Sequence, residues 1–487
     1  MLFTNKEKKK LKKDLFNTLT KNKNIVSVTL VGSFWENNSS QDFSDIDIVI
    51  ILKKFNKKDY HECLKRINRL NLKKYKLGHL KTFINPTFGP LKFNTKNNIV
   101  FHTMIYDIKG HIDHVLKSPF TCFDWERSLD FVGKSLKEIF PVGKIQLIDF
   151  FKSRRGINSY LNNLDKNHIS YQKYIFQNSS YKLVNKKFKI DDKHKLEFSF
   201  HLCKFLITNF YKFKNQKNKI PSGNEIKSIF KAIFKNNYIF YLKNFDLLKK
   251  FKNDYDKKLT FNQVHFLKSF VSKFQKYLKS YKKKDMILLR HARTKYNNGS
   301  FLGIGRNPSI INKKSVSKKL NYLKKIKQKI VYSSTLKRSM ETARTFENLN
   351  DIILSKHLVE KNYGSAEGLD FSKLKKKYPS IILKWNKKKD PRFPCGENDN
   401  DILKRIKLFD QILKKNLRNN SKKKVIIIVT HNALLRCYLG SVFDIPKYLW
   451  VRIPIKHIQP LNFIIKDNKV IPNVDRVNLF NNLNIKL

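Results

Sequence analysis

Residues 288–297 read LLRHARTKYN, and this stretch decides the fold of the second half of the chain. An apolar run predicts a β-strand that ends on Arg290 and His291. Sheets of α/β proteins place ligands and catalytic groups at the carboxyl ends of their strands. Much later, VIIIVTHNALLR predicts another strand of this kind, which ends at His431. The two patterns together indicate an α/β domain in the second half of the chain, with its functional residues at the ends of strands.

Three further motifs lie between these strands in a fixed order. YSSTLKRSMETA places Arg338 in the first turn of a predicted helix, LVEKNYGSAEG contains Glu360, and PCGEN follows at residues 394–398. This ordered set resembles the histidine phosphatase superfamily, which includes the cofactor-dependent phosphoglycerate mutases and many small-molecule phosphatases. The resemblance extends from about Asp285 to the end of the chain and implies a phosphoglycerate mutase-like α/β/α sandwich.

The chemistry of that site follows from the residue types. A neutral imidazole nitrogen of His291 can attack phosphorus and hold the phosphoryl group, which divides one difficult displacement into two easier ones. The transferred group carries negative charge on its oxygens, so fixed cations around it lower the barrier. By resemblance, Glu360 is the acid that protonates the leaving group and then activates water, and no metal is required. The residues expected to bind phosphate are Arg290, Arg338, His431, Thr294 and Asn297.

A second motif lies near the start of the chain, where VTLVGSFWENNSSQDFSDIDIVIIL begins at Val28. It predicts a strand, a turn at Gly32-Ser33 and a second strand that begins at Asp45 and Asp47. Side chains two residues apart on a strand point to the same face. Two parallel carboxylates repel each other unless a cation lies between them, and Mg²⁺ bound to nucleotide phosphates fits such a pair. The turn offers backbone N–H groups and a hydroxyl to those phosphates.

This Gly-Ser turn followed by Asp-x-Asp resembles the nucleotidyltransferase superfamily that includes DNA polymerase β, over about the first 110 residues. The resemblance implies an α+β domain that binds Mg²⁺ and a nucleoside triphosphate. Members of the family usually add a third acid from a later strand. The predicted strand 99–107 offers Asp107 at its end, which we take as the third metal ligand, and His102 within it on the opposite face. If neither reaches the aspartate pair, the domain binds nucleotide without transferring it.

The organisation of the chain follows from these motifs and from its length of 487 residues, which suggests about three domains. We predict a multidomain α/β protein with a nucleotidyltransferase-like domain at residues 1–150 and a histidine phosphatase domain at 285–487. Between them, residues 151–284 show apolar side chains at helical spacing and predict an all-helical domain or linker. That segment opens with Arg154 and Arg155, either contacts of the triphosphate or acceptor, or surface charges.

Composition limits the partners of the chain. Lys and Arg number 102 against 38 Asp and Glu, a net charge of +64, while 41% of residues are hydrophobic and 39 are Phe. This content excludes an acidic solvating protein and argues against wholesale disorder. The lysines are spread along the whole length, so a dispersed basic surface is favoured over a dedicated nucleic-acid face. A positive field still attracts anions, and we expect phosphorylated small molecules and nucleoside triphosphates as ligands.

Cysteine usage and hydropathy predict a cytoplasmic location. Five scattered cysteines without a CxxC pair argue against a disulfide framework or a zinc site. The first residues lack the apolar segment of a secretory signal, and no apolar run approaches the roughly 18 residues of a membrane span.

Three functions remain open at this point. The leading one is a bifunctional enzyme that hydrolyses a phosphomonoester in its C-terminal domain and transfers a nucleotidyl group to an acceptor in its N-terminal domain. The second is a nucleotide-binding regulatory domain that controls a phosphatase. The third is a protein that modifies nucleic-acid ends.

Overall fold

A computed structural model describes most of the chain, and its atoms form two compact units. One unit contains residues 1–145 and 149–277, and the other contains residues 146–148 and 278–486. Most of the segment predicted as a middle domain, residues 151–277 of 151–284, is thus part of the first compact unit, while the functional division into three domains stays a prediction. The described residues are 4–36, 45–89, 98–177, 180–190, 192–252, 254, 257–281, 284–419, 425–467 and 469–480.

The first unit is built on a five-stranded mixed sheet in the order β3-β4-β2-β1-β5. β2 is parallel to β4, and β4 to β3, whereas β1 is antiparallel to both β2 and β5. β1 and β2 are rich in Ile and Val, as expected of strands buried on both faces. The strands are β1 (Ile25–Val31), β2 (Ile46–Leu52), β3 (Lys81–Asn85), β4 (Asn98–Asp107) and β5 (Phe131–Gly133).

Helices cover one face of this sheet, and a hairpin and short helices pack on the other. α1 (Asn5–Leu19) and α3 (Lys57–Asn68) bury their apolar sides against residues of β1, β2 and β4. α1 begins with a capping box in which Thr4 and Glu7 satisfy each other's backbone N–H groups. The remaining elements of this part are α2 (Ser33–Glu36), η1 (Leu72–Tyr75), α4 (Ile108–Lys117), α5 (Pro119–Trp125) and α6 (Leu136–Ile139).

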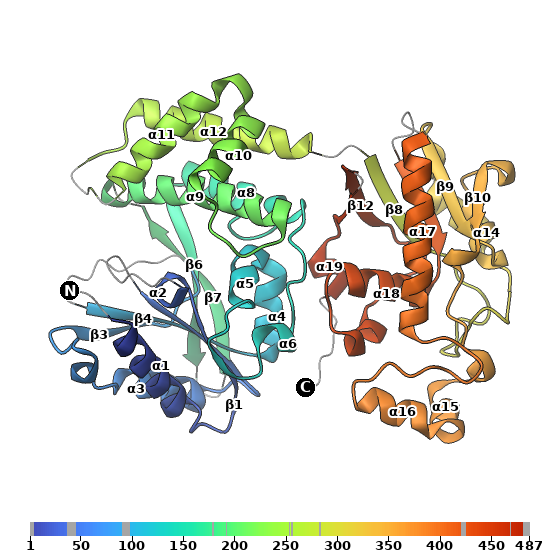
Figure 1. Ribbon diagram of the computed structural model, residues 1–487, viewed down its shortest axis with the longest axis horizontal. Coiled ribbons are helices and arrows are strands. Elements are labelled where there is room, and N and C mark those ends of the chain that lie inside the picture. The colour runs from blue at the N-terminus through green and yellow to red at the C-terminus, as the bar shows by residue number, and fades with distance from the viewer. Residues whose placement is uncertain are drawn as a thin grey trace. The chain divides into compact units, whose positions relative to one another are not determined.

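The segment that follows is largely helical, but the prediction that it is all-helical is wrong for residues 168–189. There β6 (His168–Gln177) and β7 (Ser180–Lys189) form an antiparallel two-stranded sheet. Tyr174 of β6 packs against the cores on the five-stranded sheet. The helices are α7 (Asp149–Lys152), α8 (Ile157–Asp165), α9 (Asp192–Asn215), α10 (Gly223–Phe234), η2 (Lys235–Asn237), α11 (Tyr238–Phe251) and α12 (Phe261–Lys279), of which Figure 1 labels α8 to α12.

The second unit contains a six-stranded sheet in the order β10-β9-β11-β8-β12-β13. The first four strands in this order are mutually parallel, and β12 and β13 add an antiparallel edge. Parallel strands align their carboxyl ends along one edge, which places the ends of β8, β9 and β11 together. Their bounds are β8 (Lys284–Arg290), β9 (Lys329–Ser334), β10 (Ile352–Ser355), β11 (Val425–Thr430), β12 (Leu461–Lys466) and β13 (Lys469–Pro472).

Helices cover both faces of the second sheet, which gives the expected α/β/α sandwich. Leu289 and Val429 pack with residues of α13 and α14, whereas their neighbours Leu288 and Ile428 pack with residues of α17 and α18. The elements of this unit are α13 (Lys313–Lys324), α14 (Lys337–Ala343), η3 (Leu349–Asp351), η4 (Lys356–Leu358), η5 (Gly364–Ala366), α15 (Phe371–Lys377), α16 (Pro379–Asn386), α17 (Asp399–Asn419), α18 (Asn432–Val442), η6 (Lys447–Arg452) and α19 (Arg476–Phe480).

No helix within the described parts of the chain is long and apolar enough to span a membrane.

Candidate active sites

The C-terminal site forms where three parallel strands end side by side. His291 directly follows β8 and His431 directly follows β11, and the backbone N–H of His291 donates to the carbonyl of Thr430 at 2.9 Å. The two imidazole rings lie with their centroids 5.0 Å apart. Arg338, in the first turn of α14 after β9, is fully buried beside them. The strand ends therefore bring together residues that lie far apart in the chain.

The ring of His291 is oriented by a hydrogen bond of its Nδ1 to the carbonyl oxygen of Ala292, at 2.6 Å. A carbonyl can only accept, so Nδ1 carries the proton and the lone pair of the neutral ring lies on Nε2. Burial, together with the charges of Arg338 and Arg290, holds the pKa of His291 well below its ordinary value of 6.5. The ring is therefore neutral near pH 7, which is the form that can attack phosphorus.

Three buried nitrogens around this ring have no hydrogen-bond partner within the described structure. They are Nε of Arg290, Nε of Arg338 and Nδ1 of His431. Buried polar atoms are nearly always paired, and a cluster of exceptions needs a physical explanation. A bound anion whose oxygens accept from these nitrogens supplies one.

Both arginines are anchored through their other nitrogens. Arg338 donates from Nη1 to the carbonyl of Arg306 and from Nη2 to that of Gly303, each at 2.9 Å. Arg290 donates from Nη1 to the carbonyl of Ile455 at 2.8 Å. Burial lowers the pKa of Arg290 to about 10, so its side chain remains a cation near neutral pH. The anchors fix the guanidinium planes before a ligand arrives, which reduces the entropy lost on binding.

Glu360 lies at the N-terminus of α18 and is held there by backbone groups. Its carboxylate accepts from the N–H groups of Asn432 and Ala433, at 3.0 Å each, and from that of Lys361 at 2.9 Å. A carboxylate at a helix N-terminus is stabilised by the helix dipole. It is 4% exposed, so a buried carboxylate stands beside the cationic cluster.

The GEN part of the PCGEN motif positions the segment that carries Glu360. Glu397 forms a two-point ion pair with Arg405, at 2.8 and 2.9 Å, and also accepts from the backbone N–H of Asn362. Arg405 in turn donates to the carbonyls of His357, Val359 and Glu360. The ion pair and these hydrogen bonds form a brace that holds the chain in place on both sides of Glu360.

Thr294 and Asn297 bind each other. The backbone N–H and the hydroxyl of Thr294 both donate to Oδ1 of Asn297, at 2.7 and 3.3 Å. This bond fixes the amide so that its Nδ2 is the group left to donate outward. Their role as phosphate ligands stays a prediction, because the described contacts are to each other.

Two residues at this site were not predicted from the sequence. Ser334, the last residue of β9, pairs through its hydroxyl with Nε2 of His431 at 2.8 Å and fixes that ring. His457 donates from Nδ1 to the carbonyl of His291 at 2.7 Å, with ring centroids 5.3 Å apart. Ser334 lies in the quoted YSSTLKRSMETA motif but was not singled out there, and His457 lies in none of the quoted motifs.

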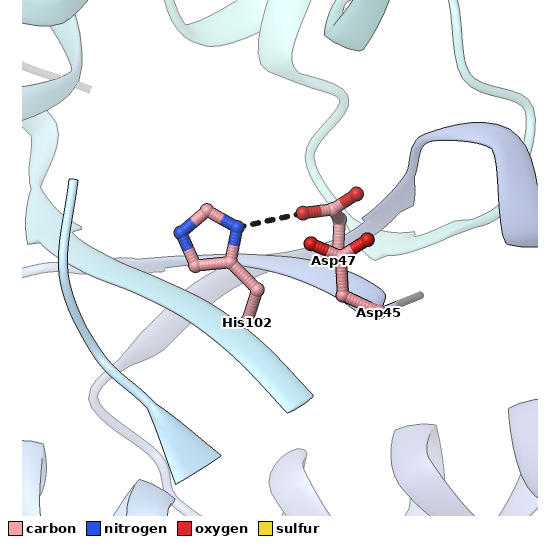
Figure 2. A group of neighbouring side chains, drawn as sticks. All are labelled: Asp45, Asp47 and His102. Carbon is pink, nitrogen blue, oxygen red and sulfur yellow. Dashed lines mark hydrogen bonds and ion pairs between the residues drawn. The ribbon is translucent and has the colours of Figure 1, made fainter. Parts of the chain in front are cut away.

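The N-terminal site forms across three neighbouring strands. Asp47 of β2 is paired in register with His102 of β4 on one side and with Val31, the last residue of β1, on the other. His102 Nδ1 lies 2.8 Å from Oδ1 of Asp47, and one ligand atom from each of Asp45, Asp47 and His102 lies within 4.8 Å of the others (Figure 2). The carboxylates of Asp45 and Asp47 thus lie close together, on the same side of the strand, as the alternation of side chains predicted.

Gly32 allows the backbone to approach this cluster closely. Its φ is +88°, and a Cβ atom there would lie 2.4 Å from Oδ2 of Asp47. Glycine is therefore required by conformation and by space. Ser33, predicted to bind phosphates, begins α2, but its side chain lies outside the described part of the chain, as do residues 37–44 of the quoted motif.

The prediction of Asp107 as the third metal ligand is wrong. Asp107 pairs with Leu52 at the opposite end of β2 from Asp47, and its carboxylate caps α4 by accepting from the N–H of Gly110 at 2.7 Å. The third member of the cluster is His102, which the sequence placed on that strand but which we did not choose. The parallel register of β2 and β4 decides between them.

His102 is held on both sides of its ring. Nε2 donates to the carbonyl of Thr87 at 2.8 Å, and Thr87 is fixed by bonds of its N–H and hydroxyl to Oδ1 of Asn85. Burial alone would lower the pKa of His102, but the hydrogen bond and charge of Asp47, with the charge of Asp45, outweigh burial and raise it.

Two histidines and two anchored arginines thus lie together at the strand ends of the second sheet, and two aspartates lie with a histidine beside a glycine turn in the first. Comparison with protein families agrees: residues 286–471 match the histidine phosphatase superfamily (branch 1), and residues 11–106 match the nucleotidyltransferase domain. The family comparison thus bears out both resemblances, with a nucleotidyltransferase domain in the N-terminal part of the chain and a histidine phosphatase domain in the C-terminal part.

Curated relatives resemble part of the chain. A fructose-2,6-bisphosphatase of Saccharomyces cerevisiae is 27% identical over 156 residues, which cover 31% of this chain and 32% of that protein. The chain thus spans about a third of that relative's length. A 2,3-bisphosphoglycerate-dependent phosphoglycerate mutase of Buchnera aphidicola is 29% identical over 201 residues, which cover 34% of this chain and 86% of that protein.

Solved structures also match at low identity. A mycobacterial glucosyl-3-phosphoglycerate phosphatase is 18% identical, with a TM-score of 0.35, and covers 39% of this chain and 97% of its own. A phosphoserine phosphatase from Entamoeba histolytica is 20% identical, with a TM-score of 0.34, and covers 39% and 95%.

Proposed function

We propose that the chain is a bifunctional enzyme. Its C-terminal domain hydrolyses a phosphomonoester without metal, through a phosphohistidine at His291, and its N-terminal domain uses a divalent cation to transfer a nucleotidyl group from a nucleoside triphosphate to an acceptor. The observation that carries the first half is the group of three unpartnered buried nitrogens around His291. They are arranged as donors to one anion, beside a nucleophile in its neutral form.

The proposed hydrolysis proceeds in two displacements. Nε2 of His291 attacks phosphorus, the bond from phosphorus to the ester oxygen breaks, and the leaving alkoxide takes the proton of Glu360. Water then attacks the phosphohistidine, gives one proton to Glu360 and releases phosphate as the nitrogen–phosphorus bond breaks. Arg290, Arg338 and His431 donate to the phosphoryl oxygens throughout, where charge is concentrated.

Glu360 accepts every hydrogen bond described for it, which suits the carboxylate form and hence its role as a base in the second displacement. Its role as the acid of the first displacement rests on the family resemblance.

The N-terminal half of the proposal rests on Asp45 and Asp47. Two carboxylates beside a glycine turn fit a divalent cation and the phosphates that it binds. The cation supplies charge neutralisation at the triphosphate when it is bound. The chain's own groups orient the ligands, since Gly32 leaves room for Asp47 and the backbone amides of the turn that begins α2 follow directly after the strand end.

A nucleotide-binding regulator is the second candidate, and the cluster at Asp47 favours it in one respect. No third carboxylate joins Asp45 and Asp47 among the residues that the structure describes, where His102 stands instead. Without a third acid, the cluster lacks a group that could take up the proton lost by the acceptor molecule. In that case the domain binds nucleotide and adjusts the phosphatase. A nucleic-acid end-modifying function has the net charge of +64 and the polymerase-like motif in its favour.

The proposed location is the cytoplasm, because all five cysteines are free thiols and four of them are buried.

Reciprocal variants of the full chain test the two activities. His291→Ala should abolish hydrolysis of a panel of phosphomonoesters and leave transfer of labelled nucleotide intact. Asp45→Asn combined with Asp47→Asn should abolish transfer and leave hydrolysis intact, and urea unfolding of each variant shows whether the altered unit is folded. Unchanged hydrolysis in the first variant refutes the phosphatase assignment, and wild-type nucleotide binding without transfer selects the regulatory alternative.

A further inference from the structure

The donor set at the N-terminal site is mixed. Asp45 and Asp47 offer carboxylate oxygens, and His102 offers an imidazole nitrogen, all within 4.8 Å. Side chains of Asp47 and His102 are 22% and 12% exposed, so the cluster is shielded but reachable. Mg²⁺ binds oxygen and keeps much of its water, whereas imidazole is a ligand of first-row transition metals.

The orientation of His102 is the one that a metal-binding histidine adopts. Because the carbonyl of Thr87 can only accept, Nε2 carries a proton and donates to it. Nδ1 is then the ring atom directed at Asp47, whose carboxylate can only accept, and a cation bound there would take the place of the Nδ1 proton. Metal-binding histidines generally donate their second nitrogen to a carbonyl or carboxylate, which fixes the ring. Thr87 is itself fixed by Asn85, whose strand β3 is paired with β4 at His102.

Gly32 lets the side chain of Asp47 lie directly against the turn. The side chain of Asp47 lies so close to the turn that no Cβ atom fits at position 32. The chain thus places a glycine, two carboxylates and an oriented imidazole at adjoining strand ends. The residues present fit a divalent cation, and they fit one that accepts a nitrogen ligand better than one restricted to oxygen.

We propose that Nδ1 of His102 is a metal ligand, and that the N-terminal site therefore selects a transition-metal dication of the Mn²⁺ type over Mg²⁺. This inference rests on the proposed function only in that the domain binds a divalent cation. Mg²⁺, the cation expected from the sequence, should then bind to the same residues more weakly than such a metal.

Manganese binding to the full-length protein tests the proposal without any measurement of activity. Loss of the free Mn²⁺ electron paramagnetic resonance signal gives the affinity, and pulsed measurements detect nitrogen coupled to the bound ion. We expect a ¹⁴N imidazole coupling that changes to the ¹⁵N pattern when the protein is labelled with ¹⁵N-histidine. Mg²⁺ should displace Mn²⁺ only at concentrations at least about 100-fold higher than the Mn²⁺ present.

His102→Asp supplies the variant and Asp107→Asn its matched control, a carboxylate change at the other end of the same strand. His102→Asp should lose the nitrogen coupling and favour Mg²⁺ in the competition by about tenfold or more relative to wild type. Asp107→Asn should keep both properties. Cooperative urea unfolding of the first compact unit reports that each variant has folded, and the wild-type spectra decide the question even if a variant does not fold.

The possible results separate this inference from the proposed function. Bound Mn²⁺ without histidine coupling, or an unchanged Mg²⁺ competition in His102→Asp, overturns the inference. Nucleotidyl transfer supported equally by Mg²⁺ and Mn²⁺ in such a case would leave the proposed function standing. Histidine-coupled Mn²⁺ in a protein that transfers no nucleotide supports the inference and refutes the transfer.

Discussion

Replacement of Gly32 by Ala should disable the N-terminal metal site while the chain still folds. The added Cβ atom would lie 2.4 Å from Oδ2 of Asp47, and ordinary contact begins near 3.4 Å, so the carboxylate must move by about 1 Å. Asp47 can do so by rotating, because the clashing atom ends a short side chain. Rotation away from a favoured rotamer costs about 0.5–1.5 kcal/mol, and an L-residue at a φ of +88° costs about 1–2 kcal/mol more.

The loss of metal binding is a second effect, separate from this cost in stability. A rotation of Asp47 breaks the 2.8 Å contact between its Oδ1 and Nδ1 of His102 and removes one ligand from the cluster. We therefore expect Mn²⁺ affinity to fall by about tenfold or more and nucleotidyl transfer to fall at least in proportion. Hydrolysis by the second domain should remain at the wild-type rate.

Manganese titration and urea unfolding of the variant give the two quantities. Gly299→Ala is the matched control: Gly299 has a φ of +96°, and a Cβ atom added there would meet no other atom within 4 Å, so the substitution tests backbone strain alone. That variant should lose stability and keep metal affinity. Wild-type Mn²⁺ affinity in Gly32→Ala would refute the close approach of Gly32 to Asp47 on which the site is built.

Three further changes test other parts of the structure. Arg338→Lys should lower kcat/KM of hydrolysis by about 100-fold, because the carbonyls of Gly303 and Arg306 lose their donors and the planar guanidinium group is absent. A loss below about threefold in steady-state kinetics would contradict this prediction. Because the pKa of His291 lies well below 6.5, its ring stays neutral as the pH falls, and His291 should cause no titration of kcat/KM near pH 6.5. A histidine with an ordinary pKa would instead reduce kcat/KM about tenfold by pH 5.5. Burial lowers the pKa of His111 to about 4, so the unfolded ring binds a proton below pH 6.5 while the folded ring does not. The folded state should then lose roughly 3 kcal/mol as the pH falls through this window, and His111→Leu should flatten that slope in urea unfolding; an equal slope in both proteins would show that His111 does not titrate in this way.

The sequence was most informative where a strand delivers a functional group at its end. Arg290 and His291 after one apolar run, and His431 after another, needed only the rule that parallel strands share a carboxyl edge. Asp45 and Asp47 needed only the alternation of side chains on a strand. These are local properties, and the structure brings both sets together as expected.

Properties of strand pairing could not be predicted in the same way. The choice of Asp107 over His102 failed because it depended on the register between β2 and β4, which nothing in either strand specifies. Ser334 and His457 reach the ring pair through backbone and side-chain contacts set by neighbouring strands. The hairpin at 168–189 was missed because its lysines and aromatic residues satisfy helical and strand spacing alike.

The arginine brace shows a second limit. Arg405 lies on α17, 45 residues beyond Glu360, and its five hydrogen bonds connect Glu397 with the carbonyls around the carboxylate. Its sequence neighbourhood is that of any amphipathic helix with a basic face. Only the packing of the helix identifies it as a positioning residue.

Trapping the covalent intermediate is the decisive measurement for the proposed hydrolysis. The protein is mixed with a ³²P-labelled phosphomonoester, quenched in alkali within milliseconds and digested, and the labelled peptide is sequenced by mass spectrometry. We expect an acid-labile, alkali-stable phosphoryl group on His291 that appears before free phosphate and is absent from His291→Ala. Hydrolysis at full rate with no label on that ring, or with label on another residue, would contradict a phosphohistidine mechanism at this site.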